Sequence, residues 1–236
     1  KKDLSTVPGI TTLYDNGNGS WAVASINYRL SDEAIWPAQI QDCKAAVRWL
    51  RASAEVFNID PDMFVAWGNS AGGMLAVMLE VTEGSAFHED LGMGNANVSS
   101  DVQAVVDWYG PVDALLIQYE ASLETDPTVP PSPHAGLLGC DYDNCSWALM
   151  ESATARTMVD GNESPILIMH GLADAAVNVT NSMHFESVLS ENGSNYTIYF
   201  LLGVGHGSDA AWKTTEEYGK AHSFLAWLLE DYYLSE

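Results

Sequence analysis

The stretch "AWGNSAGG", residues 66–73, decides the fold. It matches the pattern G-x-S-x-G, and the residues that fill the pattern are Gly68, Asn69, Ser70, Ala71 and Gly72. Before it, residues 63–67 form a short apolar run after the turn-forming sequence Asp-Pro-Asp, which is typical of a buried strand. After it, apolar residues recur at helical spacing as far as Val81. The sequence therefore predicts a strand, a sharp turn and a helix, with Ser70 at the turn.

This local arrangement is the one in which a serine can act as a nucleophile. A sharp turn from strand to helix exposes the serine hydroxyl, and it needs small neighbours because bulky ones would clash. The N–H groups at the start of the following helix stabilise negative charge that develops nearby. Ser70 is a candidate nucleophile on these grounds. The pattern is short, however, and a serine can also fall in a glycine-rich turn by chance.

The rest of the chain alternates between strand-like and helix-like patterns. Apolar strand-like runs occur at residues 21–27, 63–68, 102–110, 165–171 and 196–203. Helical patterns lie at residues 37–57, 181–193 and 214–233. This alternation predicts a mostly parallel sheet with helices on both faces, and 236 residues suit one α/β domain over 1–236.

One segment interrupts the alternation. Residues 111–164 separate the strands predicted near 102–110 and 165–171, and they include the proline-rich sequence "DPTVPPSPH", residues 126–134. Long segments of this kind inside a compact domain are usually functional. We expect a lid or a substrate-pocket insertion here, and the alternative is a surface excursion with short helices.

Charge and composition exclude several classes of partner. The chain has 32 acidic against 9 basic residues and a formal net charge of −23, which argues against binding to nucleic acid or to anionic membranes. No apolar run is long enough to cross a membrane, so we expect no membrane span. No cluster of metal ligands is visible in the sequence, and we expect neither a metal nor an organic cofactor.

Glycosylation signals and cysteines point to a secreted protein. The N-x-S/T sequons, which exceed the number expected by chance, are at Asn18, Asn97, Asn144, Asn162, Asn178, Asn192 and Asn195. Cys140 and Cys145 are close enough in sequence to close a small disulfide loop. Cys43 shares a helical face with Ile40 and Val47, which indicates a buried thiol.

A serine nucleophile needs a base that takes its proton and an acid that orients the base. Asp174 follows the strand predicted at 165–171, and His206 lies between glycines just after the strand predicted at 196–203. The remaining histidines fit this role less well, because they fall in helical patterns, in polar or proline-rich loops, or inside a strand end: His184, His222, His88, His134 and His170. We therefore predict a triad of Ser70, Asp174 and His206.

Five segments carry a resemblance to a known family: "SINYRLSDEAIWPAQIQDCKAAVRWL", "WGNSAGG", "VVDWYGPVD", "HGLADAAV" and "GVGHG". From about Trp21 to Leu229 the chain resembles the esterase/lipase branch of the α/β-hydrolases. It is most similar to hormone-sensitive-lipase-like carboxylesterases and to the feruloyl- and acetyl-esterase-like group. The resemblance implies a nucleophilic Ser70 and an oxyanion hole that uses the backbone N–H of Ala71. The implied activity is that of a secreted serine carboxylesterase acting on a small-molecule or carbohydrate-linked ester.

One family motif has no counterpart. An H-G-G-G segment normally precedes the strand–turn–helix that carries the serine, which is called the nucleophile elbow. The segment completes the oxyanion hole, and this sequence contains none. In the family's strand order, a further strand lies between those predicted here at 21–27 and 63–68. We therefore expect an upstream or companion segment to fill that slot, since unpaired buried strands cost free energy.

Two other functions remain open on the sequence. A serine peptidase of the prolyl-oligopeptidase type shares the order of the three residues, and a non-catalytic hydrolase-fold binding protein shares the fold. The acyl group of the ester is not specified either: acetyl, short acyl and feruloyl groups all fit. Trp108 and Tyr109 are either pocket-lining aromatics or core residues.

Overall fold

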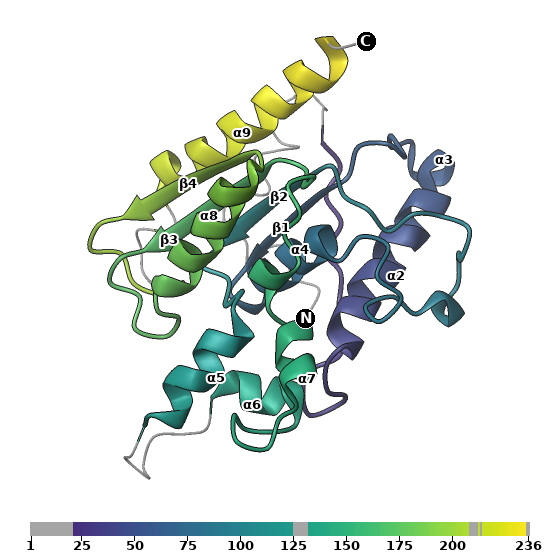
Figure 1. Ribbon diagram of the computed structural model, residues 1–236. Helices are drawn as coiled ribbons and strands as arrows, with labels where there is room; N and C mark the ends of the chain where they lie inside the picture. Colours follow the sequence, from purple (N-terminus) through teal and green to yellow (C-terminus); the bar gives the residue numbers. More distant parts are fainter. Residues whose placement is uncertain (1–20, 125–131, 208–211, 213, 235–236) are drawn as a thin grey trace.

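The computed structural model describes residues 21–124, 132–207, 212 and 214–234 (Figure 1). Within this part of the chain, a parallel sheet has the order β1-β2-β3-β4. Its strands are β1 (Val65–Asn69), β2 (Ala104–Trp108), β3 (Ile166–Gly171) and β4 (Tyr196–Leu201). Their carboxyl ends are aligned, because Asn69 pairs with Trp108 and Trp108 pairs with Met169. Parallel strands with connecting helices confirm the predicted α/β-hydrolase class of fold.

The helices lie between the strands, as the alternating pattern predicts. The longer ones are α2 (Ala38–Ala52), α4 (Ala71–Val81), α5 (Ala114–Ser122), α8 (Thr180–Asn192) and α9 (Thr215–Leu234). The shorter ones are α3 (Ala54–Phe57), α6 (Pro133–Leu138), α7 (Trp147–Ser152), η2 (Leu91–Met93) and η3 (Ala155–Thr157). The helix predicted over 37–57 is divided at Ser53 into α2 and α3.

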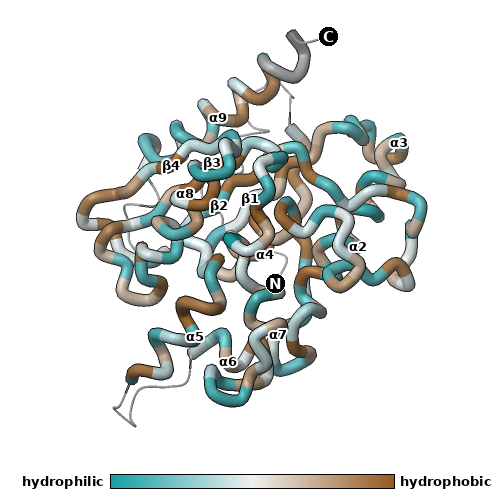
Figure 2. The backbone as a smooth tube through the Cα atoms, in the orientation of Figure 1, coloured by the Kyte–Doolittle hydropathy of each residue, from teal (hydrophilic) through white to brown (hydrophobic). Residues whose placement is uncertain are grey.

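Both faces of the sheet are buried, because successive strand residues point to opposite sides. On one face, Val105, Ile166 and Ile168 pack with residues of α2, α4 and α8. On the other face, Val106 and Leu167 pack with residues of α9. Figure 1 shows α9 on the side of the sheet away from α4, and Figure 2 shows hydrophobic residues along the central strands.

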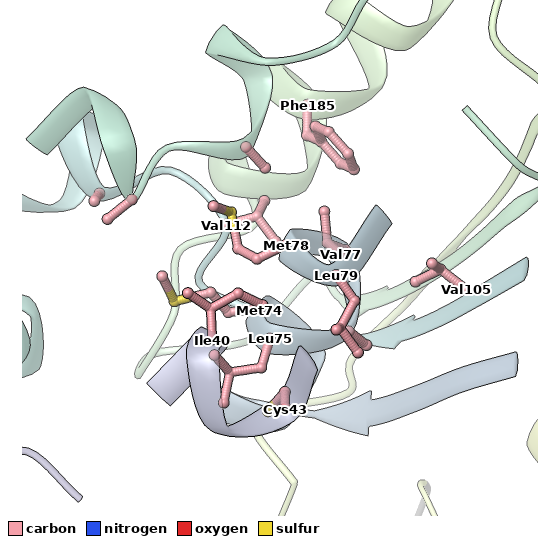
Figure 3. Packing of buried hydrophobic residues seen from close by; sticks show 14 of the residues in the cluster. Ile40, Cys43, Met74, Leu75, Val77, Met78, Leu79, Val105, Val112 and Phe185 are labelled. Atoms are coloured by element: carbon pink, nitrogen blue, oxygen red, sulfur yellow. The ribbon is translucent and has the colours of Figure 1, made fainter. Parts of the chain in front are cut away.

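The core on the α4 side is built from three helices and the sheet. Figure 3 shows Ile40 and Cys43 of α2 beside Leu75 of α4, with Phe185 of α8 further along the same cluster. The Cys43 thiol is 2 % exposed, and burial raises its pKa to about 12. Cys43 is therefore a buried, unreactive thiol, as its helical position predicts.

The strand prediction for residues 21–27 is wrong in this structure. These residues have no strand partner among the described residues, and β1 has a partner on one edge only. The side chains still alternate, since Trp21 packs on the α9 side and Ile26 on the α4 side. The segment has the pattern of a strand but lacks a neighbouring strand to bond.

The segment 111–164 contains helices in its described part. It holds α5, α6, α7 and η3, and a disulfide joins Cys140 to Cys145. His134, predicted to lie in a proline-rich loop, is instead a buried residue of α6. Residues 125–131, which contain most of the proline-rich sequence, are outside the described residues. The lid function stays a prediction.

Two buried cations were not predicted. Lys44 and Arg48 of α2 are fully buried, and each pairs with Glu89. Lys44 also donates to the carbonyl of Thr82, and Arg48 donates to those of Asp90 and Gly94. These bonds attach the segment after α4 to α2.

No helix among the described residues is both long and apolar enough to cross a membrane.

Candidate active site

Ser70 lies at a sharp turn between β1 and α4. Its backbone has φ 53° and ψ −123°, a conformation that non-glycine residues rarely adopt. The turn is held because the Ser70 N–H donates to the carbonyl of Trp108 over 2.9 Å. A side chain at Gly68 would overlap the carbonyl of Gly72, so the turn requires glycine at position 68. Gly72 has open space around it, and its role in the pattern is not steric.

The structure brings Ser70, His206 and Asp174 together in a hydrogen-bonded chain. Nε2 of His206 lies 2.9 Å from Oγ of Ser70, and Nδ1 lies 2.7 Å from Oδ2 of Asp174. An ionised carboxylate only accepts, so Nδ1 of His206 carries the proton that it donates to Asp174. Nε2 is then the acceptor for the Ser70 hydroxyl. This is the arrangement in which a histidine takes a proton from serine.

Asp174 is surrounded by hydrogen-bond donors. Its side chain is buried, and Oδ1 accepts hydrogen bonds from the backbone N–H groups of Ala176 and Val177, each over 2.9 Å. Nε2 of His170 lies 3.4 Å from Oδ2. Burial lowers the pKa of His170, and its Nδ1 bonds the Ser182 hydroxyl. His170 is thus a neutral histidine behind the acid, in keeping with a structural role.

The other acidic side chains near β2 are engaged elsewhere. Asp107 is fully buried beneath the turn, where Oδ1 accepts from the Gly110 N–H, and burial raises its pKa to about 7. Asp113 caps α5 and pairs with Arg156 over 2.5 Å. The carboxylate that contacts His206 is that of Asp174. Asp174 is therefore the acid that the geometry places behind the histidine.

The start of α4 offers a donor for an oxyanion. Ala71 is the first residue of the helix, so its N–H has no carbonyl one turn earlier to bond. It directly follows Ser70, at the positive end of the helix dipole. This is the position at which the resemblance places one donor of the oxyanion hole.

Tyr109 and Trp212 are site residues whose contacts the sequence did not reveal. Tyr109 is 3 % exposed, and its ring lies edge-to-face against His206 with centroids 4.8 Å apart. Trp212 is 1 % exposed and donates from Nε1 to the carbonyl of Gly205 over 2.8 Å. Trp108 is also buried in the core. Burial places Trp108 in the core, whereas the buried Tyr109 also contacts the histidine, and whether it lines a substrate pocket stays a prediction.

Metal ligands do not cluster in the described part of the chain. No group of three or more His, Cys, Asp or Glu side chains there has the arrangement of a metal site. The residues that the fold brings together are instead a serine, a histidine and an aspartate joined by hydrogen bonds.

Comparisons with known proteins agree with the fold and with an esterase family. The family model described as BD-FAE matches residues 5–189. Esterase LipQ of Mycobacterium tuberculosis is 29% identical over 79% of this chain and 42% of its own length. Esterase LipC of the same organism is 26% identical over 86% of this chain and 49% of its own length. The chain therefore spans about half the length of these two relatives.

Solved structures with higher identity carry related names. A truncated form of a carbohydrate esterase from gut microbiota has a TM-score of 0.75 and 33% identity, covering 86% of this chain and 73% of that one. A bifunctional GH43-CE protein of Bacteroides eggerthii has a TM-score of 0.79 and 30% identity, covering 94% of this chain and 28% of that one. The family match spans most of the sequence, and the chain belongs to the BD-FAE family of α/β-hydrolase esterases.

Proposed function

We propose that this protein hydrolyses carboxylic esters through an acyl-enzyme formed on Ser70. The observation that carries the proposal is the hydrogen-bonded chain from Ser70 through His206 to Asp174, at a strained turn before α4. Esterase relatives and carbohydrate esterase neighbours support the reaction class.

In the first half of the reaction, Oγ of Ser70 attacks the acyl carbon while Nε2 of His206 takes its proton. The oxyanion that forms accepts a hydrogen bond from the Ala71 N–H. The carbon–oxygen bond to the alcohol then breaks, and His206 returns the proton to the departing alcohol. Asp174 keeps the imidazole in the required tautomer and stabilises the imidazolium.

In the second half, water takes the place of the alcohol. His206 removes a proton from the water as its oxygen attacks the acyl carbon, and the second tetrahedral intermediate collapses. The bond to Ser70 Oγ breaks, and Oγ recovers its proton from His206. The products are one carboxylic acid and one alcohol, and the chain returns to its starting state.

The names of two similar solved structures guide the choice of substrate. Each is at least 30% identical to this chain, and they are described as a carbohydrate esterase and a GH43-CE protein. We propose an acylated carbohydrate as the substrate, with small aryl esters as usable probes. The helices of the segment 111–164 are proposed to form part of the substrate pocket.

A further strand is proposed to pair with β1. Within the described residues β1 has one neighbouring strand, β2. Segment 21–27 has side chains on both sides of the sheet, Trp21 on the α9 side and Ile26 on the α4 side, as a strand beside the sheet would. An upstream or companion segment that enters this slot would pair with β1 and bring further N–H donors toward Ser70.

Secretion with glycosylation is also proposed. The sequon asparagines in the described part of the chain are all exposed: Asn97, Asn144, Asn162, Asn178, Asn192 and Asn195. Asn18 lies outside the described residues. Exposure is what the transferase requires, and a disulfide between Cys140 and Cys145 suits an oxidising compartment. Treatment of the native protein with a glycosidase tests this, and an unchanged mass would contradict it.

The esterase proposal is tested by Ser70→Ala with an aryl acetate. We expect kcat to fall by about 10⁴-fold or more, with a residual rate from binding and the oxyanion donors. A variant that keeps near-parent activity would show that Ser70 is not the nucleophile. Hydrolysis of a dipeptidyl aryl amide with little ester hydrolysis would instead favour a peptidase. No turnover of either probe, by the chain alone or by the chain with a segment paired to β1, would favour a non-catalytic binding protein.

A further inference from the structure

Tyr109 occupies a strained position directly after β2. Its φ is 47°, in the left-handed region that favours glycine, and a non-glycine residue there costs about 1–3 kcal/mol. Its N–H donates to the carbonyl of Met169 on the next strand over 2.8 Å, which fixes the backbone. Strain of this kind is retained where the surrounding structure requires the side chain in one place.

The Tyr109 side chain connects the two loops that carry Ser70 and His206. Its hydroxyl accepts a hydrogen bond from Nδ2 of Asn69, the residue before Ser70, over 3.2 Å. Its ring packs edge-to-face on the imidazole of His206 at an interplanar angle of 64°. A side chain at Gly207 would overlap the hydroxyl, so the backbone after His206 lies directly against the phenol.

Trp212 supports the same arrangement from behind. Its ring lies 4.3 Å from that of Tyr109, and its indole N–H donates to the carbonyl of Gly205. The histidine loop is thereby held on both sides of His206, at Gly205 by Trp212 and at Gly207 by Tyr109. The Tyr109 ring therefore contacts the imidazole of His206 whether or not the Ser70 hydroxyl bonds to that imidazole.

We propose that Tyr109 is a positioning residue that keeps His206 aligned with the acyl carbon after Ser70 has been acylated. The inference rests on the proposed function and extends it to the second half of the reaction. In the free protein the imidazole is held at both nitrogens, by Asp174 and by Ser70. In the acyl-enzyme, Oγ is an ester oxygen with no proton to donate, so the bond at Nε2 is lost.

The loss matters because His206 must then bind and deprotonate water. Once the bond at Nε2 is lost, it no longer limits rotation of the ring about the Nδ1 contact, whereas the Tyr109 ring packed against the imidazole still restricts that rotation. An error of about 1 Å in such a position can cost on the order of 10²-fold in rate. Tyr109 therefore acts more strongly on deacylation than on acylation.

The test is stopped-flow kinetics with p-nitrophenyl acetate. The assay uses whichever form of the protein is active, either the chain alone or the chain together with the companion segment. The variants are Tyr109→Leu, which removes the aromatic ring, and Tyr109→Phe, which keeps the ring and removes the hydroxyl. Tyr199→Leu is the matched control, because Tyr199 lies on β4 with 37% exposure and its ring lies beneath Lys220 of α9.

For Tyr109→Leu we expect deacylation to slow by about 10- to 100-fold while acylation changes by less than about threefold. Acyl-enzyme then accumulates, so kcat and KM fall together and the burst amplitude stays near one per protein. Tyr109→Phe restores most of the rate, with deacylation about threefold slower than in the parent. Tyr199→Leu behaves as the parent. If Tyr109→Leu folds poorly, the inference is tested by comparing the deacylation rate of Tyr109→Phe with that of the parent.

A fall in burst amplitude with unchanged KM would mean fewer active molecules, and would overturn the inference in favour of a structural role. Equal slowing of acylation and deacylation would overturn it as well. If Ser70→Ala retains parent activity, the proposed function fails and this inference with it. If Ser70→Ala is inactive but Tyr109→Leu matches the parent, this inference alone fails.

Discussion

At the scale of single residues, Asp174 is distinguished by what bonds to it. Both carboxylate oxygens accept hydrogen bonds, from His206 on one and from the loop backbone on the other. Asp113, which also lies near the end of β2, instead caps the start of α5 and forms an ion pair with Arg156. Replacement by asparagine is therefore expected to affect kcat strongly at Asp174 and weakly at Asp113.

Asp174→Asn should lower kcat by about 10⁴-fold, because an amide in place of the carboxylate favours the wrong tautomer of His206. Asp113→Asn should retain kcat within about tenfold and lower stability, since it weakens an ion pair away from the triad. Steady-state kinetics on an aryl acetate compare the two. Greater sensitivity at Asp113 would show that the acid is misassigned.

A second prediction at this scale concerns Asp107, whose pKa burial raises from 3.8 to about 7. The folded state therefore binds this proton more tightly than the unfolded state. The stabilising contribution is complete below about pH 4 and is lost as the pH rises toward 7, at up to about 1.4 kcal/mol per pH unit. Asp107→Asn should remove this decline.

Urea unfolding at pH 5, 6, 7 and 8 measures the effect in parent and variant. Part of the decline remains in the variant, because burial also raises the pKa of Glu80 to about 7. Identical pH slopes for the two proteins would show that Asp107 is ionised in the folded state throughout this range.

At the scale of elements, α2 combines an apolar face with two buried cations. Arg48 donates to the carbonyls of Asp90 and Gly94 and pairs with Glu89. Burying a charge is costly unless it is paired, and removing one partner leaves the other charge unpaired. The attachment of the segment after α4 therefore depends on Arg48.

Arg48→Met should lower the free energy of unfolding by about 3–5 kcal/mol, because it removes the donor to two buried carbonyls and leaves Glu89 with only Lys44 and the Ser100 hydroxyl as partners. The control is Arg29→Met. Arg29 pairs with Asp42 at 42% exposure of its side chain, and the loss of such a pair costs about 1 kcal/mol or less. Urea unfolding at one pH compares them. Equal costs would contradict the structural role given to Arg48.

Local patterns predicted the elements around the site well. The helix after the elbow has the predicted bounds, Ala71–Val81, because the glycines mark its start and its apolar residues repeat at one spacing. Residues 21–27 had an equally clear strand pattern, but a strand needs a partner, and the pattern of one segment cannot supply it. Short helices within 111–164 were one of the two alternatives that the sequence left open, but each is too short for its apolar spacing to give its bounds.

Contacts between distant residues explain most of what the sequence did not reveal. The burial of Lys44 and Arg48 depends on carbonyls 38 to 46 residues away, and the bond from Asn69 to Tyr109 spans 40 residues. No periodicity encodes such pairs. Ser70, Asp174 and His206 were predictable because each follows its own strand, and parallel strands bring their carboxyl ends to one edge of the sheet.

At the scale of the whole molecule, the sheet is bounded by the free edge of β1 within the described residues. Unpaired buried backbone groups cost about 1–3 kcal/mol each. We expect the 236-residue chain made alone to be poorly folded and nearly inactive, and its activity to rise when a segment pairs with β1. Thermal unfolding and esterase assays with and without native upstream sequence test this. A cooperative melt with full activity of the chain alone would contradict it.

The central claim is that Ser70 is an activated nucleophile, and covalent labelling tests it most directly. The native protein is treated with a fluorophosphonate, and the adduct is located by mass spectrometry of its peptides. The account predicts one adduct per protein, on Ser70, and none on the His206→Ala variant, because the serine then lacks its base. Absence of labelling in the parent, or an adduct on another residue, would contradict the account.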